Sequence, residues 1–317
     1  MKRPLQKVGL AAAVCSLILF TRCAGNPQPP VPAALAGDAS DLDCIIVAGE
    51  RVRIGARVVT WEEPDGYNAY RLGKHFDRSA GLDGKRRYGE RPGAPQTIEE
   101  LRDTVHQFVV HYDACGTSRQ CFKVLHDIRD LSVHFMLDVD GTIYQTLDLK
   151  ERAWHATVAN DGAVGIEIAH PGAWLSPLNA DMRRWYERDR DGWRMKLPAW
   201  MTEAGVRTPG FVPRPARQQF VSGFVQGEEY HQFDFTEQQY DALARLLAGI
   251  NLALPQIRLT APRSVDGGIA DRALPREALL DFDGVVGHFH VQTNKQDPGP
   301  AFQWERVLAE ARSLRGF

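Results

Sequence analysis

The chain has 317 residues, of which 44% are hydrophobic and 25% are charged, and its formal net charge is −2. This length gives room for one large domain or two small ones with a sizeable core. The nearly neutral charge, without a basic stripe, argues against nucleic acid as a partner.

The N-terminus has the pattern of an export signal. Lys2 and Arg3 precede an apolar stretch from Val8 to Phe20, and a Pro-rich segment follows. A short cationic segment before an apolar run of about 7–15 residues is typical of a secretory signal, and the run is shorter than the roughly 20 residues of a membrane span. We therefore predict a signal peptide over residues 1–23 and a protein of the cell envelope or the exterior.

Cys23 lies just after this run, where a bacterial lipoprotein carries its lipidated cysteine. Arg22 departs from the small residue normally found before such a cysteine. Two possibilities stay open: a lipid anchor through Cys23, which makes a periplasmic or outer-membrane lipoprotein, and simple secretion. Residues 24–43 are rich in Pro, Ala, Gly and Asp, which predicts a flexible tether.

The folded part is expected to begin near residue 44. Residues 44–95 have mixed character, with apolar runs at 45–47 and 57–61 that predict strands. We expect this segment to form an N-terminal extension packed on a main domain over residues 96–317.

The main domain alternates apolar runs with helical patterns. Thr97 and Glu100 form a capping box that starts a helix, and Thr236 with Gln239 caps a longer helix at about 236–251. The other predicted elements are strands within 107–112, 132–138, 142–147 and 164–170, a hairpin turn at 138–141 and a final helix at about 301–313. This mixture predicts an α/β (α+β) fold with a central mixed β-sheet flanked by helices.

Residues 171–235 fit this pattern least. They contain Trp, Pro and charged residues without a sustained period, so we interpret them as a long insertion between sheet and helix that could shape a cleft. Two interpretations of the tryptophans stay open, a sugar-stacking surface and internal packing. The tryptophans are Trp174, Trp185, Trp193 and Trp200.

Two histidines and an aspartate stand at the ends of apolar runs. His111 ends the run that starts at Phe108, His288 follows Val285-Val286-Gly287, and Asp297 lies in the Gly/Pro-bounded loop after His288. Two imidazoles and one carboxylate give the ligand count of a catalytic zinc site that keeps its fourth position for water. His290 is an alternative ligand, because it lies two residues from His288.

Strand alternation places one acidic side chain, that of Glu167, away from the apolar face of its predicted strand. In the run 164–170 the apolar residues and His170 share one face, while Glu167 lies on the other. Burying an unpaired carboxylate is costly, so Glu167 needs a cation, a donor or a functional reason unless its face is solvated. We interpret His170 as structural.

The cysteines suggest one local pair. Cys115 and Cys121 lie six residues apart, shortly after His111. In an oxidising compartment this spacing allows a local disulfide, and the alternative is two free thiols. Cys44 has no evident partner.

Four sequence blocks occur in order along the chain. They are Phe108–His111; Ser132–Asp138 with Asp140–Gln145; Arg152–Ala156 with Val164–Ile168; and Gly287–His288 with Lys295–Pro300. Over about residues 100–310 they resemble the zinc-dependent N-acetylmuramoyl-L-alanine amidases, the amidase 2 group related to the peptidoglycan recognition proteins.

The resemblance implies roles for residues at matching positions. It implies a zinc ion in a groove at one sheet face, held by His111, His288 and Asp297; Glu167 as the acid that handles the water proton; Lys295 as a cation near the oxyanion; Tyr144 and His155 as substrate-groove residues; His134 as a structural histidine; and a disulfide between Cys115 and Cys121.

The chain also departs from the family pattern. The interval from His288 to Asp297 is nine residues, one shorter than expected for the closest bacterial branch. The insertion at about 171–235 is longer than the family core requires, and residues before about 95 match nothing in it.

The function implied by the resemblance is hydrolysis of the amide between N-acetylmuramic acid and L-alanine in peptidoglycan or its fragments, by an amidase catalytic domain over residues 96–317. Two alternatives stay open. One is a non-catalytic peptidoglycan-binding protein, and the other is a zinc hydrolase of another amide.

Overall fold

A computed structural model of the chain describes residues 43–77, 79 and 81–317. The predicted signal peptide, Cys23 and the tether up to residue 42 lie outside these ranges. No helix within the described part is both long and apolar enough to traverse a lipid bilayer.

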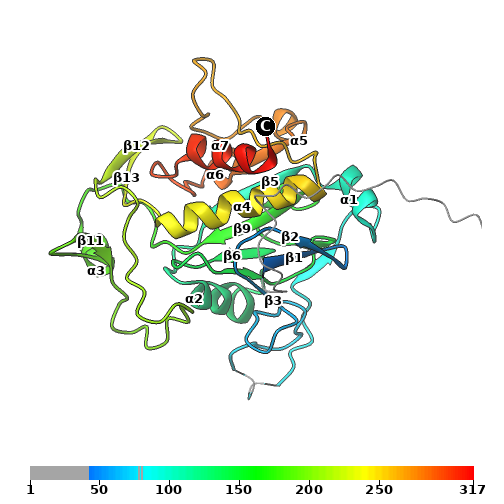
Figure 1. The fold of residues 1–317 in the computed structure, drawn as a ribbon, viewed down its shortest axis with the longest axis horizontal. Helices are drawn as coiled ribbons and strands as arrows, with labels where there is room; N and C mark the ends of the chain where they lie inside the picture. The colour runs from blue at the N-terminus through cyan, green and yellow to red at the C-terminus, as the bar shows by residue number, and fades with distance from the viewer. Residues whose placement is uncertain (1–42, 78, 80) are drawn as a thin grey trace, which may run out of the picture. The chain divides into compact units, whose positions relative to one another are not determined.

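A six-stranded mixed sheet forms the centre of the fold (Figure 1). In spatial order its strands are β14 (Gly284–Gly287), β5 (Gln107–Tyr112), β9 (Ala163–Ile168), β6 (Phe135–Leu137), β7 (Ile143–Gln145) and β3 (Val58–Thr60). All neighbouring pairs are parallel except β6 with β7, which form the predicted hairpin. The predicted fold class is therefore confirmed.

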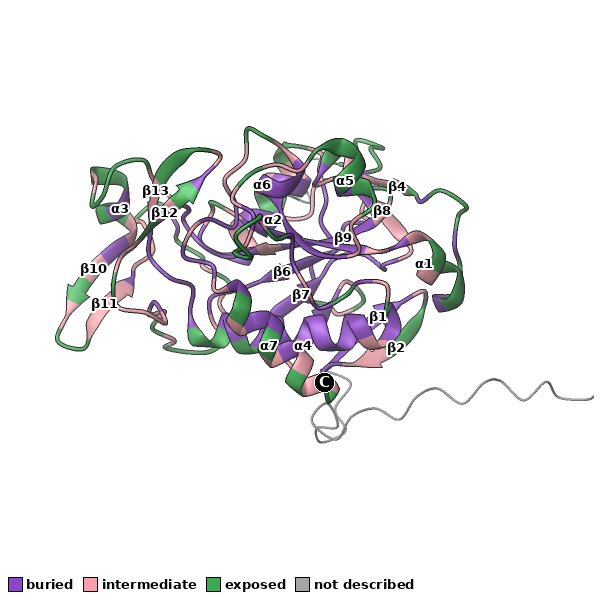
Figure 2. Cartoon of the chain, turned by 90° about the horizontal axis from the view of Figure 1, so that it is seen from above, coloured by how far each residue is buried: buried purple, intermediate pink, exposed green. Residues whose placement is uncertain are grey.

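Helices cover both faces of the sheet (Figure 2). One face packs on the long C-terminal helices α4 (Glu237–Ala253) and α7 (Trp304–Arg315) through one apolar cluster. The helices near the other face are α2 (Ser118–Phe122), the π-helical segment η4 (Lys123–Ile128), α5 (Arg276–Leu280) and α6 (His288–Val291). Both sides of a largely parallel sheet are thus buried, which explains its continuous apolar runs.

The predicted capping boxes begin helices where expected. Thr97 accepts a hydrogen bond from the Glu100 backbone at the start of α1 (Ile98–Thr104), and the Glu100 side chain accepts from the Thr97 backbone. Thr236 and Gln239 make the same reciprocal pair at the start of α4. Local side-chain chemistry therefore fixes where these helices start.

The segment 44–95 is built into the sheet. Its strand β3 pairs with β7 as an edge strand of the central sheet. Its remaining strands are β1 (Cys44–Val47) and β2 (Glu50–Arg53), which form a hairpin, and β4 (Tyr88–Glu90), which pairs with β8 (Glu151–Ala153). The Gln145 side chain bonds both backbone groups of Ile46, at 2.7 Å each. The extension therefore shares its core with the main domain.

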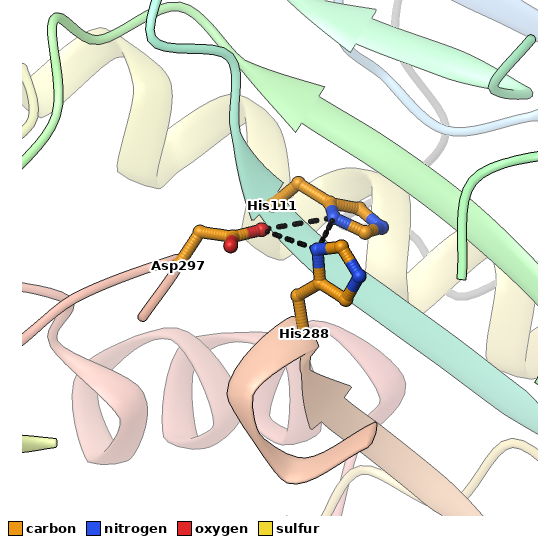
Figure 3. Close-up of side chains that lie close together, drawn as sticks. All are labelled: His111, His288 and Asp297. Carbon is orange, nitrogen blue, oxygen red and sulfur yellow. Dashed lines mark hydrogen bonds and ion pairs between the residues drawn. The ribbon is translucent and has the colours of Figure 1, made fainter. Parts of the chain in front are cut away.

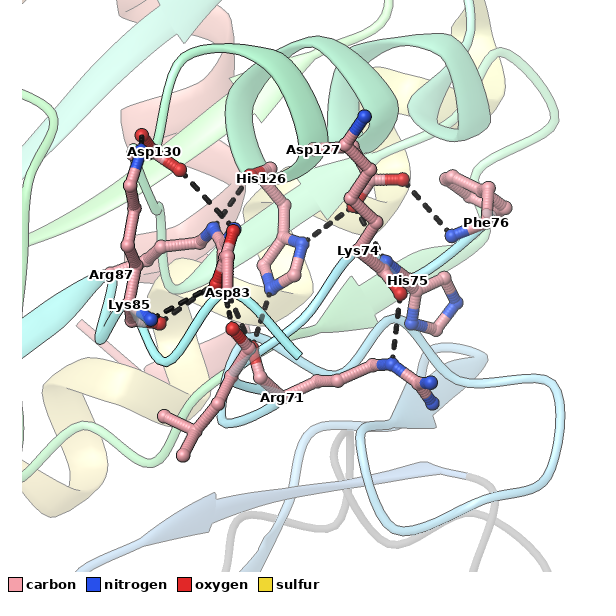
Figure 4. A network of polar contacts seen from close by, with 11 residues as sticks. Arg71, Lys74, His75, Phe76, Asp83, Lys85, Arg87, His126, Asp127 and Asp130 are labelled. Carbon is pink, nitrogen blue, oxygen red and sulfur yellow. Dashed lines mark hydrogen bonds and ion pairs between the residues drawn. The ribbon is translucent and has the colours of Figure 1, made fainter. Parts of the chain in front are cut away.

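A buried arginine ties the loop before β4 to the helical segment beside the sheet (Figure 4). The Arg87 guanidinium donates to His126 O at 2.7 Å and to Asp83 at 2.7 Å, and it lies 3.2 Å from Asp130. Asp127 accepts the backbone N–H groups of His75 and Phe76. These contacts tie η4 and the residues just after it to the segment 75–87 of the extension.

The insertion is more regular than its sequence indicates. It contains the short helix α3 (Ala180–Trp185) and two hairpins, β10 (Tyr186–Asp189) with β11 (Gly192–Met195) and β12 (Val221–Val225) with β13 (Glu228–Gln232). Strands of four or five residues are too short to give a sustained period, which explains why the sequence pattern missed them.

Internal packing accounts for most of the insertion tryptophans. Trp174, Trp185 and Trp193 pack against an apolar cluster that includes Phe233. Trp174, Trp185 and Trp193 are partly buried, whereas Trp200 is 61% exposed, so Trp200 is the most accessible of the four rings.

Candidate metal centre

Adjacent strands bring the candidate residues together. In the β5–β9 register His111 lies beside Glu167, and β14 on the other side of β5 ends at Gly287, directly before His288. Phe108 and Val110 face the α4 side, so His111 and its register partner Glu167 share the opposite face.

Three ligand-type atoms converge at this end of the sheet (Figure 3). His111 Nδ1 lies 2.9 Å from His288 Nδ1, and each of these nitrogens lies 2.9 Å from Asp297 Oδ2. All three side chains are buried. The two imidazole nitrogens and the carboxylate oxygen therefore form a triangle of three potential metal-ligand atoms.

The donor set fits a divalent cation. Gln292 Oε1 accepts from His288 Nε2 at 2.8 Å, so His288 Nδ1 presents a lone pair to the centre. His111 Nδ1 can donate a proton to either His288 Nδ1 or Asp297 Oδ2. In both cases His288 Nδ1 and Asp297 Oδ2 remain two acceptors in contact, and they repel each other. A central cation relieves all three contacts, and two histidine nitrogens with a carboxylate oxygen suit zinc.

The electrostatics of the unliganded residues agree with a ligand role. Burial, then the proximity of His288, lowers the pKa of His111 to about 4, so this imidazole is neutral at physiological pH. Burial alone would raise the pKa of Asp297, but His288 and His111 outweigh it and hold that pKa below its usual range. A neutral histidine and an ionised aspartate are the protonation states that metal binding requires.

His155 stands behind His111. Its Nδ1 lies 3.0 Å from His111 Nε2, and its own Nε2 is buried without a hydrogen-bond partner within the described residues. Burial, then His111, lowers the pKa of His155 well below the usual value, so the ring is neutral. Gly165 makes room for it, because a Cβ at that position would overlap the His155 ring.

A cavity of about 280 Å³ joins these groups to Glu167 and Lys295. Glu167 Oε2 is occluded and has no hydrogen-bond partner in the part of the chain described. Burial, then the charge of Asp297, raises the pKa of Glu167 well above its usual value, and Lys295 opposes this shift. The cavity lining thus contains eight of the site residues predicted from the sequence: His111, Cys115, Cys121, His155, Glu167, His288, Lys295 and Asp297.

Tyr144 lies apart from this cavity. Its ring stacks on Tyr67 with centroids 4.2 Å apart, and its hydroxyl donates to Gly205 O at 3.2 Å. It lines a separate depression with Arg119 and Arg207 instead. Packing against loops of the extension and the insertion places Tyr144 in this depression, and its role as a substrate-groove residue stays a prediction.

The predicted disulfide between Cys115 and Cys121 is not formed in the structure. Cys115 and Cys121 are free thiols in the structure, and so is Cys44. Burial, then the neighbouring Cys115 side chain, raises the pKa of the Cys121 thiol, so the two residues lie close together. The sequence therefore placed the pair correctly, and the difference concerns only the covalent bond.

Three other histidines are engaged in structural contacts. His290 is no ligand of the cluster, because its Nδ1 accepts from Gly287 N and its Nε2 contacts Ala270 O at 2.7 Å. His134 accepts from Gly165 N at 3.1 Å, and His170 contacts Phe233 O at 2.9 Å. The structural interpretation of His134 and His170 is confirmed.

Sequence reasoning missed two polar residues of the site. Gln292 supports His288 from four positions along the chain, a spacing typical of one helical turn. Asp113 lines the cavity and accepts the N–H groups of Cys115, Gly116 and His170, and burial raises its pKa to about 7. Its position two residues after His111, on the same face if the strand continues, could have identified it from the sequence.

One family model matches residues 101–300, which is more than half of the chain, and describes N-acetylmuramoyl-L-alanine amidases. The chain therefore belongs to the N-acetylmuramoyl-L-alanine amidase family. No curated protein matches it.

Several solved structures are similar at low identity. A selenomethionine derivative of AmpD is 17% identical, with 71% of this chain and 89% of that one covered and a TM-score of 0.36. AmiD from E. coli, in complex with the substrate anhydro-N-acetylmuramic acid-L-Ala-D-gamma-Glu-L-Lys, is 19% identical, with 71% and 66% covered and a TM-score of 0.37. A mutant of Drosophila PGRP-LB in complex with tracheal cytotoxin is 15% identical, with 78% and 91% covered and a TM-score of 0.32.

Proposed function

We propose that this chain is a zinc-dependent N-acetylmuramoyl-L-alanine amidase. It hydrolyses the amide between the lactyl group of N-acetylmuramic acid and L-alanine of the stem peptide, in peptidoglycan or its fragments. The observation that carries the proposal is the contact of His111 Nδ1, His288 Nδ1 and Asp297 Oδ2 at 2.9 Å, in the cavity that also contains Glu167 and Lys295. Family membership names the bond.

His111, His288 and Asp297 would hold the zinc ion. When bound, zinc supplies a Lewis acid that polarises the amide carbonyl and lowers the pKa of water. Two neutral imidazoles and one carboxylate leave the ion a net positive charge, so the site can stabilise the negative charge that develops on the carbonyl oxygen. Gln292 and His155 fix the orientation of the two ligand rings from behind.

Glu167 moves the proton. Its unpartnered Oε2 accepts a proton from the attacking water and delivers it to the nitrogen of L-alanine as the amide bond breaks. A raised pKa suits this exchange, because the acid must take up a proton and release it within one cycle. The charge of Lys295, in the same cavity, offsets the anionic character of the transition state.

The test is a digest of purified muropeptides with the zinc-loaded protein, followed by mass spectrometry. The expected products are the free stem peptide with an L-alanine amine and the peptide-free sugar, and removal of the metal by a chelator stops their release. Binding without turnover would instead support a non-catalytic peptidoglycan-binding protein. Inertness toward muropeptides would support a zinc hydrolase of another amide.

The cell envelope is the proposed place of action, as a periplasmic or outer-membrane lipoprotein or as a secreted protein. The N-terminal pattern and the location of the substrate support this. Cell fractionation tests it, and Cys23→Ser with a labelled fatty acid separates the two routes. Loss of membrane association in that variant indicates a lipid anchor, and an unchanged soluble fraction indicates secretion.

A further inference from the structure

The loop between the metal ligands His288 and Asp297 has little regular structure of its own. After α6 its internal backbone contacts include Lys295 N to Gln292 O at 3.3 Å and Phe289 N to Asp297 O at 3.1 Å. This loop nevertheless carries Asp297 and Lys295, whose positions the chemistry requires. Other parts of the chain must therefore hold it in place.

The first of these is Gln226, at the tip of the β12–β13 hairpin of the insertion. Its Nε2 donates to Phe289 O at 2.7 Å and to Gln292 O at 3.0 Å, and it lies 3.4 Å from Lys295 O. Its Oε1 accepts from Ala273 N at 3.2 Å. The Gln226 amide group thus bonds several backbone carbonyl groups along the loop between the two ligands.

Gln226 has a backbone conformation that is uncommon for glutamine. Val225 pairs with Glu228, so Gln226 and Gly227 form a two-residue turn, and both have positive φ (57° and 85°). Such turns favour Asn, Asp or Gly at the first position, and a longer side chain there carries a strain cost. The reach of the glutamine amide to the loop offsets that cost.

Gln232, at the other end of β13, holds the far side of Asp297. Its buried amide donates to Pro298 O at 3.1 Å and accepts from Ala301 N at 2.9 Å. A Cβ at Gly299 would overlap the Gln232 side chain, so the two segments are in close contact. Asp297 therefore lies between two stretches of backbone that one hairpin fixes.

We propose that the β12–β13 hairpin positions the metal-ligand loop, with Gln226 as a positioning residue for Lys295 and Asp297. This inference rests on the proposed metal centre and assigns a role to the insertion. Gln226 acts through the backbone of the loop and touches neither the metal nor the substrate.

Two variants test the proposal. Gln226→Met keeps the side-chain length and removes the amide, while Gln226→Asn suits the turn and falls one methylene short of the carbonyls. The matched control is Gln218→Met. Gln218 bonds Trp193 and Pro215 inside the insertion, so its loss weakens the insertion without reaching the loop.

The first readout is hydrogen exchange of a peptide covering residues 289–300, measured on the metal-free protein. The second is the dissociation constant for zinc, measured by competition with a chelator. Both Gln226 variants are expected to speed exchange in this peptide and to weaken zinc binding about tenfold, the lower end of the range for groups that orient metal ligands. Gln218→Met is expected to lower thermal stability and leave both readouts at the wild-type values.

Wild-type exchange and zinc affinity in both Gln226 variants would overturn the proposal, and so would equal changes in Gln218→Met. The outcome is separable from that of the proposed function. A wild-type protein that binds zinc but leaves muropeptides intact contradicts the amidase assignment alone. An active wild-type protein with unaffected Gln226 variants contradicts the positioning role alone.

Discussion

At the scale of single residues, burial and the contacts between the three side chains together set the charge of the candidate centre. Burial first, and the neighbouring His288 second, lower the pKa of His111, while Asp297 stays ionised between the two rings. The ligand set therefore carries one negative charge, which leaves a divalent ion net positive. This balance depends most strongly on Asp297, the only anionic member.

Asp297→Ala is expected to lose most of its metal. The variant keeps two imidazoles but lacks the anionic ligand and its contacts to both rings. Zinc content per chain, measured by mass spectrometry of the metal after dialysis, should fall well below one, and activity on muropeptides should fall with it. Exposed Asp281, outside the cavity, provides a control in Asp281→Ala. Normal zinc occupancy in Asp297→Ala would remove Asp297 from the ligand set.

Glu167→Gln separates proton transfer from metal binding. The amide matches the carboxyl group in size but cannot accept a proton from water, so kcat is expected to fall by about 10²–10⁴-fold. Zinc content should remain near one per chain, because Glu167 is not among the three converging atoms. Loss of the metal in this variant would show that Glu167 has another role.

At the scale of elements, the parallel register of β14, β5 and β9 assembles the site. Because the carboxyl ends of parallel strands meet at one edge, His111, Glu167 and the residue after Gly287 arrive together. The β6–β7 hairpin continues the sheet beside β9, and its turn contains a buried acid. Asp138 N donates to Thr142 O at 2.9 Å, and Gly141 takes the positive φ that closes the turn.

The Asp138 carboxyl group should make stability depend on pH. Burial raises its pKa from 3.8 to about 8, so the unfolded chain releases this proton at lower pH than the folded chain does. Stability is therefore expected to fall as pH rises from about 4 to about 8, and to level off above that range. Asp138→Asn should remove this part of the dependence. Melting temperatures of both proteins across this pH range provide the measurement, and parallel curves would contradict the assignment.

At the scale of the whole described chain, segments outside the family match pack against the elements that form the site. The family match starts at residue 101, yet β3 completes the sheet and the Arg87 network fixes η4. Val124 and Leu125 of η4 line the metal cavity. Arg87 is therefore expected to affect the cavity wall from a distance.

Arg87→Met should destabilise the fold strongly. It removes the hydrogen bonds that the buried guanidinium donates to backbone carbonyls, including that of His126, and its contacts with the partly exposed carboxylates of Asp83 and Asp130, so the free energy of unfolding is expected to fall. Arg86→Met is the matched control, since Arg86 is exposed and lies over the Tyr88 ring. Thermal or urea unfolding of the two variants provides the comparison. Equal stability would show that the network contributes little.

Sequence patterns predicted the local features. Alternation set Glu167 apart from the apolar face of its strand, capping pairs predicted the starts of α1 and α4, and the ordered blocks implied His111, His288 and Asp297 as one ligand set. These features are local or tied to a motif, so they can be read from neighbouring residues.

Which distant groups meet depends on the tertiary packing. This packing places His155 Nδ1 next to His111 Nε2 and places Tyr144 in a separate depression. It also joined Gln226 to the loop that carries Asp297, across more than sixty residues of chain. Such contacts depend on how helices and hairpins pack over the sheet, and no local periodicity encodes that packing.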